Sequence, residues 1–214
     1  MISEEFTTRD TNNLIIYFLD IKSILTLATV SKNLNKIVKN HPLYDTLIKF
    51  TKSGNKNISD WACSNNHIEI LHWRNDYMTI EKFTNEGIFL AAKFGHLNIV
   101  KFLISVGANI HAKDDYALQY SAQNGHLEVV KYLISVGANI NADDDLALLY
   151  SAYYGHLEVV KYLVSAGSNI HAENDCALRW SDNNGYLEVV KYLISVGANI
   201  QSLTKKYRNS NQLY

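Results

Sequence analysis

Apolar residues recur at helical spacing in the second half of the chain. Leu127, Val130, Leu133 and Ile134 stand at positions i, i+3, i+6 and i+7. This spacing puts all four on one face of an α-helix. The pattern therefore predicts a helix over residues 127–136.

A shorter helix is predicted just before it, over residues 117–124. Gly125 and Gly137 are expected to end the two helices, because glycine readily takes the left-handed conformation at a helix end. The stretch from Ala138 to Asp144 then forms an exposed connection. Helices this short are marginally stable alone, so each helix pair must bury its apolar face against neighbouring pairs.

The same pattern returns with a period of 30 residues. The second-helix segments read HLNIVKFLISVGANI (96–110), HLEVVKYLISVGANI (126–140), HLEVVKYLVSAGSNI (156–170) and YLEVVKYLISVGANI (186–200). A weaker copy at 62–73 aligns with 91–102, and there Asn66 stands in the place of the glycine. Repetition at a fixed period predicts a solenoid, in which each repeat contacts only its neighbours.

The string NGHLEVVKYLISVGANINA (124–142) resembles the second half of an ankyrin repeat, and the resemblance extends over about residues 59–203. It implies an all-α fold, an ankyrin-repeat solenoid of stacked helix pairs with short connecting loops. Ankyrin repeats usually have about 33 residues. Three are missing here before the first helix, which predicts tight loops. This shorter variety resembles ankyrin proteins of giant amoeba-infecting DNA viruses.

The N-terminal residues are not part of the repeats. Their apolar groups predict a small helical unit, with a fourth helix from Leu43 to Phe50. The string FLDIKSILTLATVSKNLNKIVKNHPLYDTL (18–47) resembles an F-box, the helical element that docks on the Skp1 adaptor of ubiquitin ligases. Leu34 stands in the place of its usual tryptophan, and its usual Leu-Pro start is absent. The resemblance implies that four residues would carry Skp1 docking: Ile15, Leu19, Leu25 and Val30. The alternative is a unit that only caps the first repeat.

These patterns together predict the domain organisation. The expected parts are an F-box-like helical unit (1–52), a degenerate capping ankyrin repeat (53–83), four ankyrin repeats (84–113, 114–143, 144–173 and 174–203) and a basic tail (204–214).

Composition and charge limit the classes of partner and the cellular compartment that we expect. A formal net charge of −1 offers no bulk attraction for nucleic acid. No apolar run is long enough to span a bilayer, and the first residues lack the basic start of a secretory signal. The two cysteines, Cys63 and Cys176, have no recognisable pairing. A reducing intracellular compartment is therefore expected. The resemblance to viral ankyrin proteins implies that this compartment is the host cytoplasm.

A column of histidines raises the possibility of a metal site. His96, His126 and His156 each precede the second helix of a repeat. Equivalent positions in packed helices are ~8–10 Å apart, whereas zinc ligands lie within ~2.1 Å of the metal. The column is therefore expected to bond neighbouring backbone rather than zinc.

Acidic residues gather at the predicted loop tips, 114–115, 143–145 and 173–175. The tips lack the glycine of a calcium-binding loop. Aspartates at such places start turns and cap helices. Stacked tips would also form an acidic stripe that favours a basic partner, and both roles remain open.

No set of nucleophile, base and orienting residue is visible, and the motifs of hydrolases, kinases and nucleotide-binding enzymes are missing. We therefore expect a monomeric protein without catalytic activity, metal or cofactor. Its expected function is to bind one or more target proteins.

Comparison of the repeats predicts where a target binds. Positions that stay constant serve stacking. A column of large apolar residues comprises Leu90, Tyr120, Tyr150 and Trp180, and the resemblance to ankyrin repeats implies that it packs between repeats. Positions that vary are free for recognition, and in ankyrin proteins such positions line the binding face. The expected contact residues are Phe89, Lys93, Phe94, Asp114, Asp115, Tyr116, Gln119, Gln123, Asn124, Asp144, Asp145, Leu149, Tyr153, Tyr154, Arg179, Asn183 and Asn184. For the two tyrosines at 153 and 154, half-buried filling of the groove is the alternative.

Overall fold

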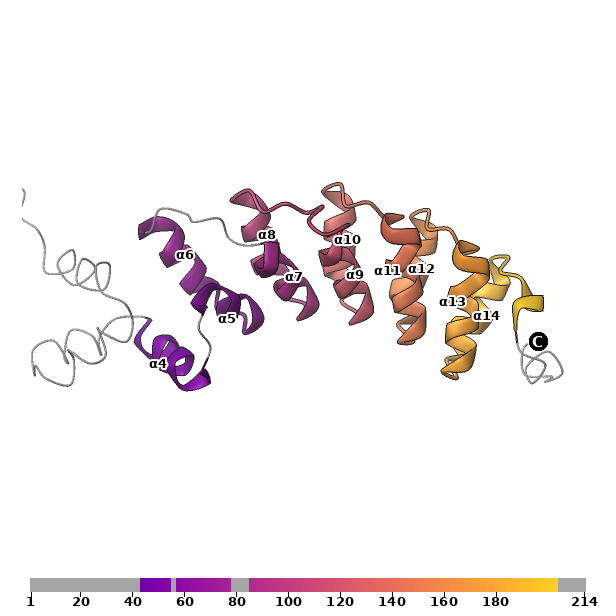
Figure 1. The fold of residues 1–214 in the computed structure, drawn as a ribbon, viewed down its shortest axis with the longest axis horizontal. Helices are drawn as coiled ribbons and strands as arrows, with labels where there is room; N and C mark the ends of the chain where they lie inside the picture. Colours follow the sequence, from indigo (N-terminus) through magenta and orange to yellow (C-terminus); the bar gives the residue numbers. More distant parts are fainter. Residues whose placement is uncertain (1–42, 55–56, 78–84, 204–214) are drawn as a thin grey trace, which may run out of the picture. The chain divides into compact units, whose positions relative to one another are not determined.

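The computed structural model of the protein describes residues 43–54, 57–77 and 85–203. The chain divides into two units, residues 1–81 and 82–214. All regular elements of the described residues are helices (Figure 1), which confirms the all-α prediction. The helices expected over residues 1–42, with the four predicted Skp1-docking residues, lie outside the described residues.

The described part of the first unit holds α4 (Tyr44–Ser53), α5 (Ile58–Ser64) and α6 (Ile68–Tyr77). Its small core brings the ring of Trp61 within 5.6 Å of the Phe50 ring and 4.8 Å of the His67 ring, measured between centroids. Between α5 and α6, Asn66 has a φ of 60°. Asparagine is one of the few residues that visits this left-handed conformation routinely, so it replaces the glycine of the other repeats.

Four helix pairs form the second unit. They are α7 (Asn85–Lys93) with α8 (Leu97–Ser105), α9 (Tyr116–Gln123) with α10 (Leu127–Ser135), α11 (Ala142–Tyr153) with α12 (Leu157–Ser165), and α13 (Ala172–Asn183) with α14 (Leu187–Ser195), followed by the 3-10 turn η1 (Ile200–Ser202). Figure 1 shows the pairs standing side by side in chain order. The observed bounds of α9 and α10 agree with the predicted helices to within one residue at each end.

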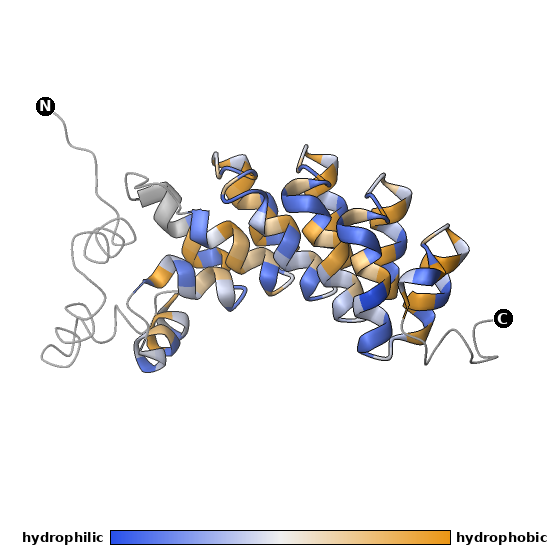
Figure 2. Cartoon of the chain, turned by 45° about the vertical axis from the view of Figure 1, so that its right-hand side comes forward, coloured by the Kyte–Doolittle hydropathy of each residue, from blue (hydrophilic) through white to orange (hydrophobic). Residues whose placement is uncertain are grey.

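The core of the second unit runs through the stack. One leucine of each second helix is completely buried, at 103, 133, 163 and 193. The first helices contribute Ile88, Leu118, Leu148 and Leu178, and each first helix packs on the first helices next to it. Figure 2 shows hydrophobic and hydrophilic residues on different sides of these helices. None of the helices in the described part is long and apolar enough to cross a membrane.

Two histidines of the column connect their repeats to the repeat before them. The Nε2 atom of His126 lies 2.9 Å from the carbonyl oxygen of Lys93, and His156 Nε2 lies 2.9 Å from that of Gln123. A carbonyl can only accept, so each ring donates its Nε2 proton. The expected role of these histidines, bonding to neighbouring backbone, is confirmed.

This arrangement makes stability depend on pH. Burial lowers the pKa of His126 from 6.5, and the charges of His156 and His96 lower it further, against the opposing effect of the hydrogen bond to Lys93. Below pH 6.5 the unfolded chain therefore binds more protons at this residue than the folded chain does. We expect the free energy of unfolding to fall as the pH drops from about 6.5 towards the folded pKa.

The measurement is urea unfolding between pH 7 and pH 5, compared with His126→Gln. Glutamine keeps an N–H donor but does not titrate, so the variant should lose less stability over this range than the native protein does. Equal losses in both proteins would contradict the prediction.

The connections between repeats are as tight as predicted. At the third repeat the chain turns through three consecutive left-handed residues, Asp143, Asp144 and Asp145, with φ of 51°, 54° and 64°. The Asp145 carboxylate is buried and accepts hydrogen bonds from Asn141 Nδ2 at 2.8 Å and from the backbone N–H of Asn169 at 2.9 Å. The last residue of each acidic tip therefore fixes its loop to the next repeat.

Candidate protein-binding face

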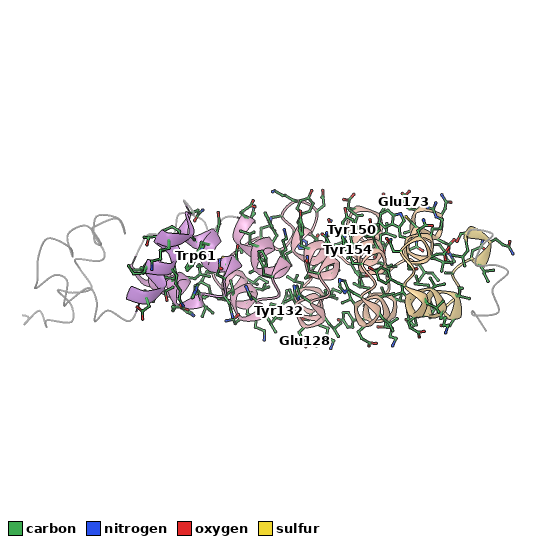
Figure 3. All side chains as sticks on the ribbon, turned by 90° about the horizontal axis from the view of Figure 1, so that it is seen from below. Trp61, Glu128, Tyr132, Tyr150, Tyr154 and Glu173 are labelled. Atoms are coloured by element: carbon green, nitrogen blue, oxygen red, sulfur yellow. The ribbon has the colours of Figure 1, made fainter. Side chains whose placement is uncertain are left out.

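The variable positions come together on one side of the second unit. They lie on α7, α9, α11 and α13 and on the loop tips that precede α9, α11 and α13, and we call this surface the first-helix face. In Figure 3, Tyr150, Tyr154 and Glu173 lie on this side, whereas Glu128 and Tyr132 lie on the opposite side.

The predicted contact residues differ in their exposure. Ten are exposed: Lys93, Phe94, Asp114, Asn124, Asp144, Tyr153, Tyr154, Arg179, Asn183 and Asn184. Three are half-buried: Phe89, Tyr116 and Gln123. The exposed and half-buried residues form the candidate face.

The other four predicted contacts need correction. Asp115, Gln119, Asp145 and Leu149 are only 3–5% exposed, and side chains buried to this degree do not reach a partner on the surface. Asp115 accepts the backbone N–H of Asn139 at 3.0 Å, as Asp145 accepts that of Asn169. These residues belong to the packing of the repeats, and we leave them out of the face.

At the first repeat of this unit, two lysines cover aromatic rings. The Lys113 ammonium lies 4.9 Å from the centroid of the Phe89 ring and 3.8 Å from the Glu86 carboxylate. The Lys93 ammonium lies 5.7 Å from the Tyr120 ring. Exposed cation–π contacts of this kind are worth ~0.5–1 kcal/mol each.

Further along, aromatic side chains cluster without lysines. The Tyr153 ring lies 4.9 Å from the Tyr154 ring and 5.4 Å from the Trp180 ring, and the Tyr150 ring lies 6.4 Å from the Trp180 ring. We call these four residues the ring cluster. Tyr153 is 39% exposed and Tyr154 43%, and the Tyr154 hydroxyl accepts a hydrogen bond from Gln123 Nε2 at 3.2 Å. Both tyrosines thus present part of their rings to solvent on this face.

Two members of the apolar column that was predicted to pack between repeats, Tyr120 and Trp180, also contribute to this face. Tyr120 and Trp180 stack on rings of the neighbouring repeats, as expected, at centroid distances of 5.9 Å from Phe89 and 6.4 Å from Tyr150. They remain half-buried rather than buried. The resemblance to ankyrin repeats implied that they pack between repeats, and the structure shows this packing with part of each side chain still exposed.

The described residues hold no group of three or more histidine, cysteine or acidic side chains that could bind a metal ion. Both cysteines are buried, and burial raises the pKa of Cys63 to about 12 and that of Cys176 above its usual value. The thiolate is the nucleophilic form of cysteine, so neither thiol is activated.

Comparison with known proteins agrees with this geometry. The family model described as ankyrin repeats (3 copies) matches residues 60–144, 88–174 and 143–204, and the F-box domain model matches residues 12–46. An ankyrin repeat protein of Acanthamoeba polyphaga mimivirus is 38% identical over 102 residues. The similar region covers 44% of this chain but only 38% of that relative. Both matched families are non-catalytic interaction modules. The stacked helix pairs and the family match together show that the chain belongs to the ankyrin-repeat family, with an F-box domain at its N-terminus.

Proposed function

We propose that the protein is an adaptor that recruits a target protein to a Skp1-type ubiquitin ligase. One observation carries the proposal: an F-box domain precedes ankyrin repeats in the same chain. That order suits an adaptor, because one part can hold the ligase while the other holds the target. The alternative is a stand-alone ankyrin scaffold or inhibitor whose N-terminal helices serve only as a cap.

The exposed aromatic residues support the first-helix face as the site of the target. Monomeric surfaces seldom gather large apolar side chains without a function, and tyrosine, tryptophan and arginine are enriched among residues that dominate binding energy. The face offers Tyr153, Tyr154, Phe94 and Arg179 in exposed positions.

The proposal also includes the cellular location, the oligomeric state and the domain boundaries of the protein. We place the adaptor inside the infected host cell, in the cytoplasm, acting as a monomer without catalysis. The similarity to a mimivirus protein supports this setting. The predicted boundaries, with a capping repeat at 53–83, remain part of the proposal.

Leu25→Asp tests the ligase half of the proposal. We expect the variant to lose Skp1 affinity by at least about tenfold, because an unpaired carboxylate at an apolar contact is costly to desolvate. The measurement is titration of the full chain with purified Skp1.

Asn33→Asp is the matched control, since it adds the same charge at a polar position of the same segment. It should bind Skp1 nearly as well as the native chain. Full-length protein that never binds Skp1, under conditions where a known F-box protein does, would leave the scaffold alternative. A truncated chain used to support this test should lack residues 1–42 only, because Leu47 and Phe50 are buried in the first unit.

Replacing both Tyr153 and Tyr154 by alanine tests the target half. We expect target binding to weaken by about 1–4 kcal/mol, the range of interface anchors. The measurement is affinity purification from host cells with quantitative mass spectrometry, followed by titration with the recovered target.

Glu128→Ala with Glu158→Ala, on the opposite face, is the control and should recover the same proteins as the native chain. If the double tyrosine variant also recovers them unchanged, the binding hot spot lies elsewhere than at these tyrosines.

A further inference from the structure

The first-helix face changes its chemistry from the first repeat of the second unit to the third. Tyr153 stands 60 residues after Lys93, at the same repeat position, and Asp143 stands 30 residues after Lys113. A ring and a carboxylate therefore stand further along the chain at the positions where the first repeat carries two lysines. The chain itself supplies an example of what such a surface binds, because Lys93 and Lys113 lie over Tyr120 and Phe89.

The ring cluster has no cation of its own. Within the part of the chain that the structure describes, no lysine or arginine lies over Tyr150, Tyr153, Tyr154 or Trp180. Arg179 is next to the cluster in sequence, but its guanidinium donates to the backbone carbonyl of Glu173 at 2.8 Å.

The exposed carboxylates of the two loop tips that precede α11 and α13 have no ion pair among the described residues. Asp143, Asp144 and Glu173 are exposed, and none forms an ion pair with another described residue. On the opposite face each second-helix glutamate is neutralised by a lysine three residues later, in the pairs Glu128–Lys131, Glu158–Lys161 and Glu188–Lys191. Within the described part of the second unit, the exposed carboxylates without an ion pair thus lie on the first-helix face.

We infer that this part of the face binds an extended basic segment of the target protein. One arginine or lysine of the segment lies against the ring cluster, and another pairs with Asp143 and Asp144. Arginine fits both places best, because its planar guanidinium stacks on aromatic rings and pairs with carboxylates through two hydrogen bonds. The inference rests on the proposal that the first-helix face binds a protein, and it adds the chemistry of the partner.

The distance between the ring cluster and the turn at Asp143 and Asp144 limits how far apart the basic residues of the bound segment can be. The regular part of α11 begins at Leu146, after the left-handed turn, and Tyr153 ends the helix. A rise of ~1.5 Å per residue puts Tyr153 about 10 Å beyond the turn. An extended chain covers that distance in about three residues, so the inferred segment carries basic residues about three positions apart.

The test uses the full-length protein and a synthetic peptide with arginine at every third position, separated by glycine and serine. Fluorescence anisotropy at about 0.15 M ionic strength, where distant charges are screened, should detect binding. We expect Tyr153→Ala, and separately Asp143→Asn with Asp144→Asn, to weaken it at least about fivefold. Asparagine tolerates the left-handed backbone of the two aspartates, so the turn should keep its conformation, and thermal melting checks this.

Two controls decide the outcome. Glu128→Gln with Glu158→Gln removes the same amount of negative charge from the opposite face and should leave the affinity within about twofold. A peptide with citrulline in place of arginine has nearly the same shape without charge and should bind at least about tenfold more weakly.

The inference is overturned if the native chain does not bind the arginine peptide, if the citrulline peptide binds equally well, or if the opposite-face variant weakens binding as much. In each case the first-helix face could still bind a target of other chemistry. The Tyr153 and Tyr154 test with the recovered target decides that separately.

Discussion

Replacing Leu133 by alanine is expected to lower the free energy of unfolding by about 2–5 kcal/mol. The Leu133 side chain has no exposed surface, and it lies in α10 between the neighbouring repeats. Removing its branched end leaves a cavity that a stack of short helices only partly closes. Urea or thermal unfolding of the variant measures the loss.

Val136→Ala is the matched control, since it removes two methyl groups three residues later, where the valine is 37% exposed. Its effect should stay within about 0.5 kcal/mol. In a solenoid the damage concentrates in adjacent repeats, so hydrogen exchange in Leu133→Ala should increase most in α8, α10 and α12. An unchanged melting temperature would contradict the stacked-pair packing.

Gly125→Ala is expected to destabilise the protein more than a left-handed backbone alone explains. The φ of Gly125 is +75°, and an added Cβ would lie 2.6 Å from Nδ1 of His156. Left-handed geometry costs a residue with a side chain roughly 1–2 kcal/mol. The His156 ring cannot move away freely, because it donates to the Gln123 carbonyl. Losing that hydrogen bond adds about 1 kcal/mol.

Gly185 provides a control at the same repeat position. Its φ is +78°, but an added Cβ would meet no atom within 4 Å. Gly185→Ala should therefore show the backbone cost alone. In a His156→Ala background the cost of Gly125→Ala should fall to a similar value, which a double-mutant cycle measures. Equal losses for Gly125→Ala and Gly185→Ala in the native background would mean that the histidine places no constraint on the glycine.

Two of the four corrected contact residues, Asp115 and Asp145, could have been assigned to the scaffold by comparing the repeats. Aspartate is present at 115, 145 and 175, whereas the two residues before it vary among lysine, aspartate, glutamate and asparagine. Constant positions serve stacking, so this pattern already marks the third tip residue as part of the scaffold. The structure bears this out through the hydrogen bonds to Asn139, Asn169 and Asn199.

For Gln119 and Leu149, comparison of the repeats gives no indication that they are buried. Their repeat position holds Phe89, Gln119, Leu149 and Arg179, so it varies as a contact position would. The structure buries the middle two and leaves the arginine exposed. Gln119 donates to the Asp114 carbonyl at 2.7 Å, and Arg179 donates to the Glu173 carbonyl at 2.8 Å. Variation at this repeat position therefore does not separate buried from exposed side chains.

The helix pairs, their glycine ends and the 30-residue period could be predicted from the sequence alone, as could the bounds of α9 and α10 to within one residue. These features follow from local rules, because apolar spacing and left-handed glycine act within a few residues. The hydrogen-bond partners of the buried aspartates, the rings that share a cluster and the carboxylates without an ion pair became visible only in the tertiary structure. Asp115 and Asn139 are 24 residues apart, and His126 and Lys93 are 33 apart. Contacts of this range exist only once the repeats have stacked, so no local pattern contains them.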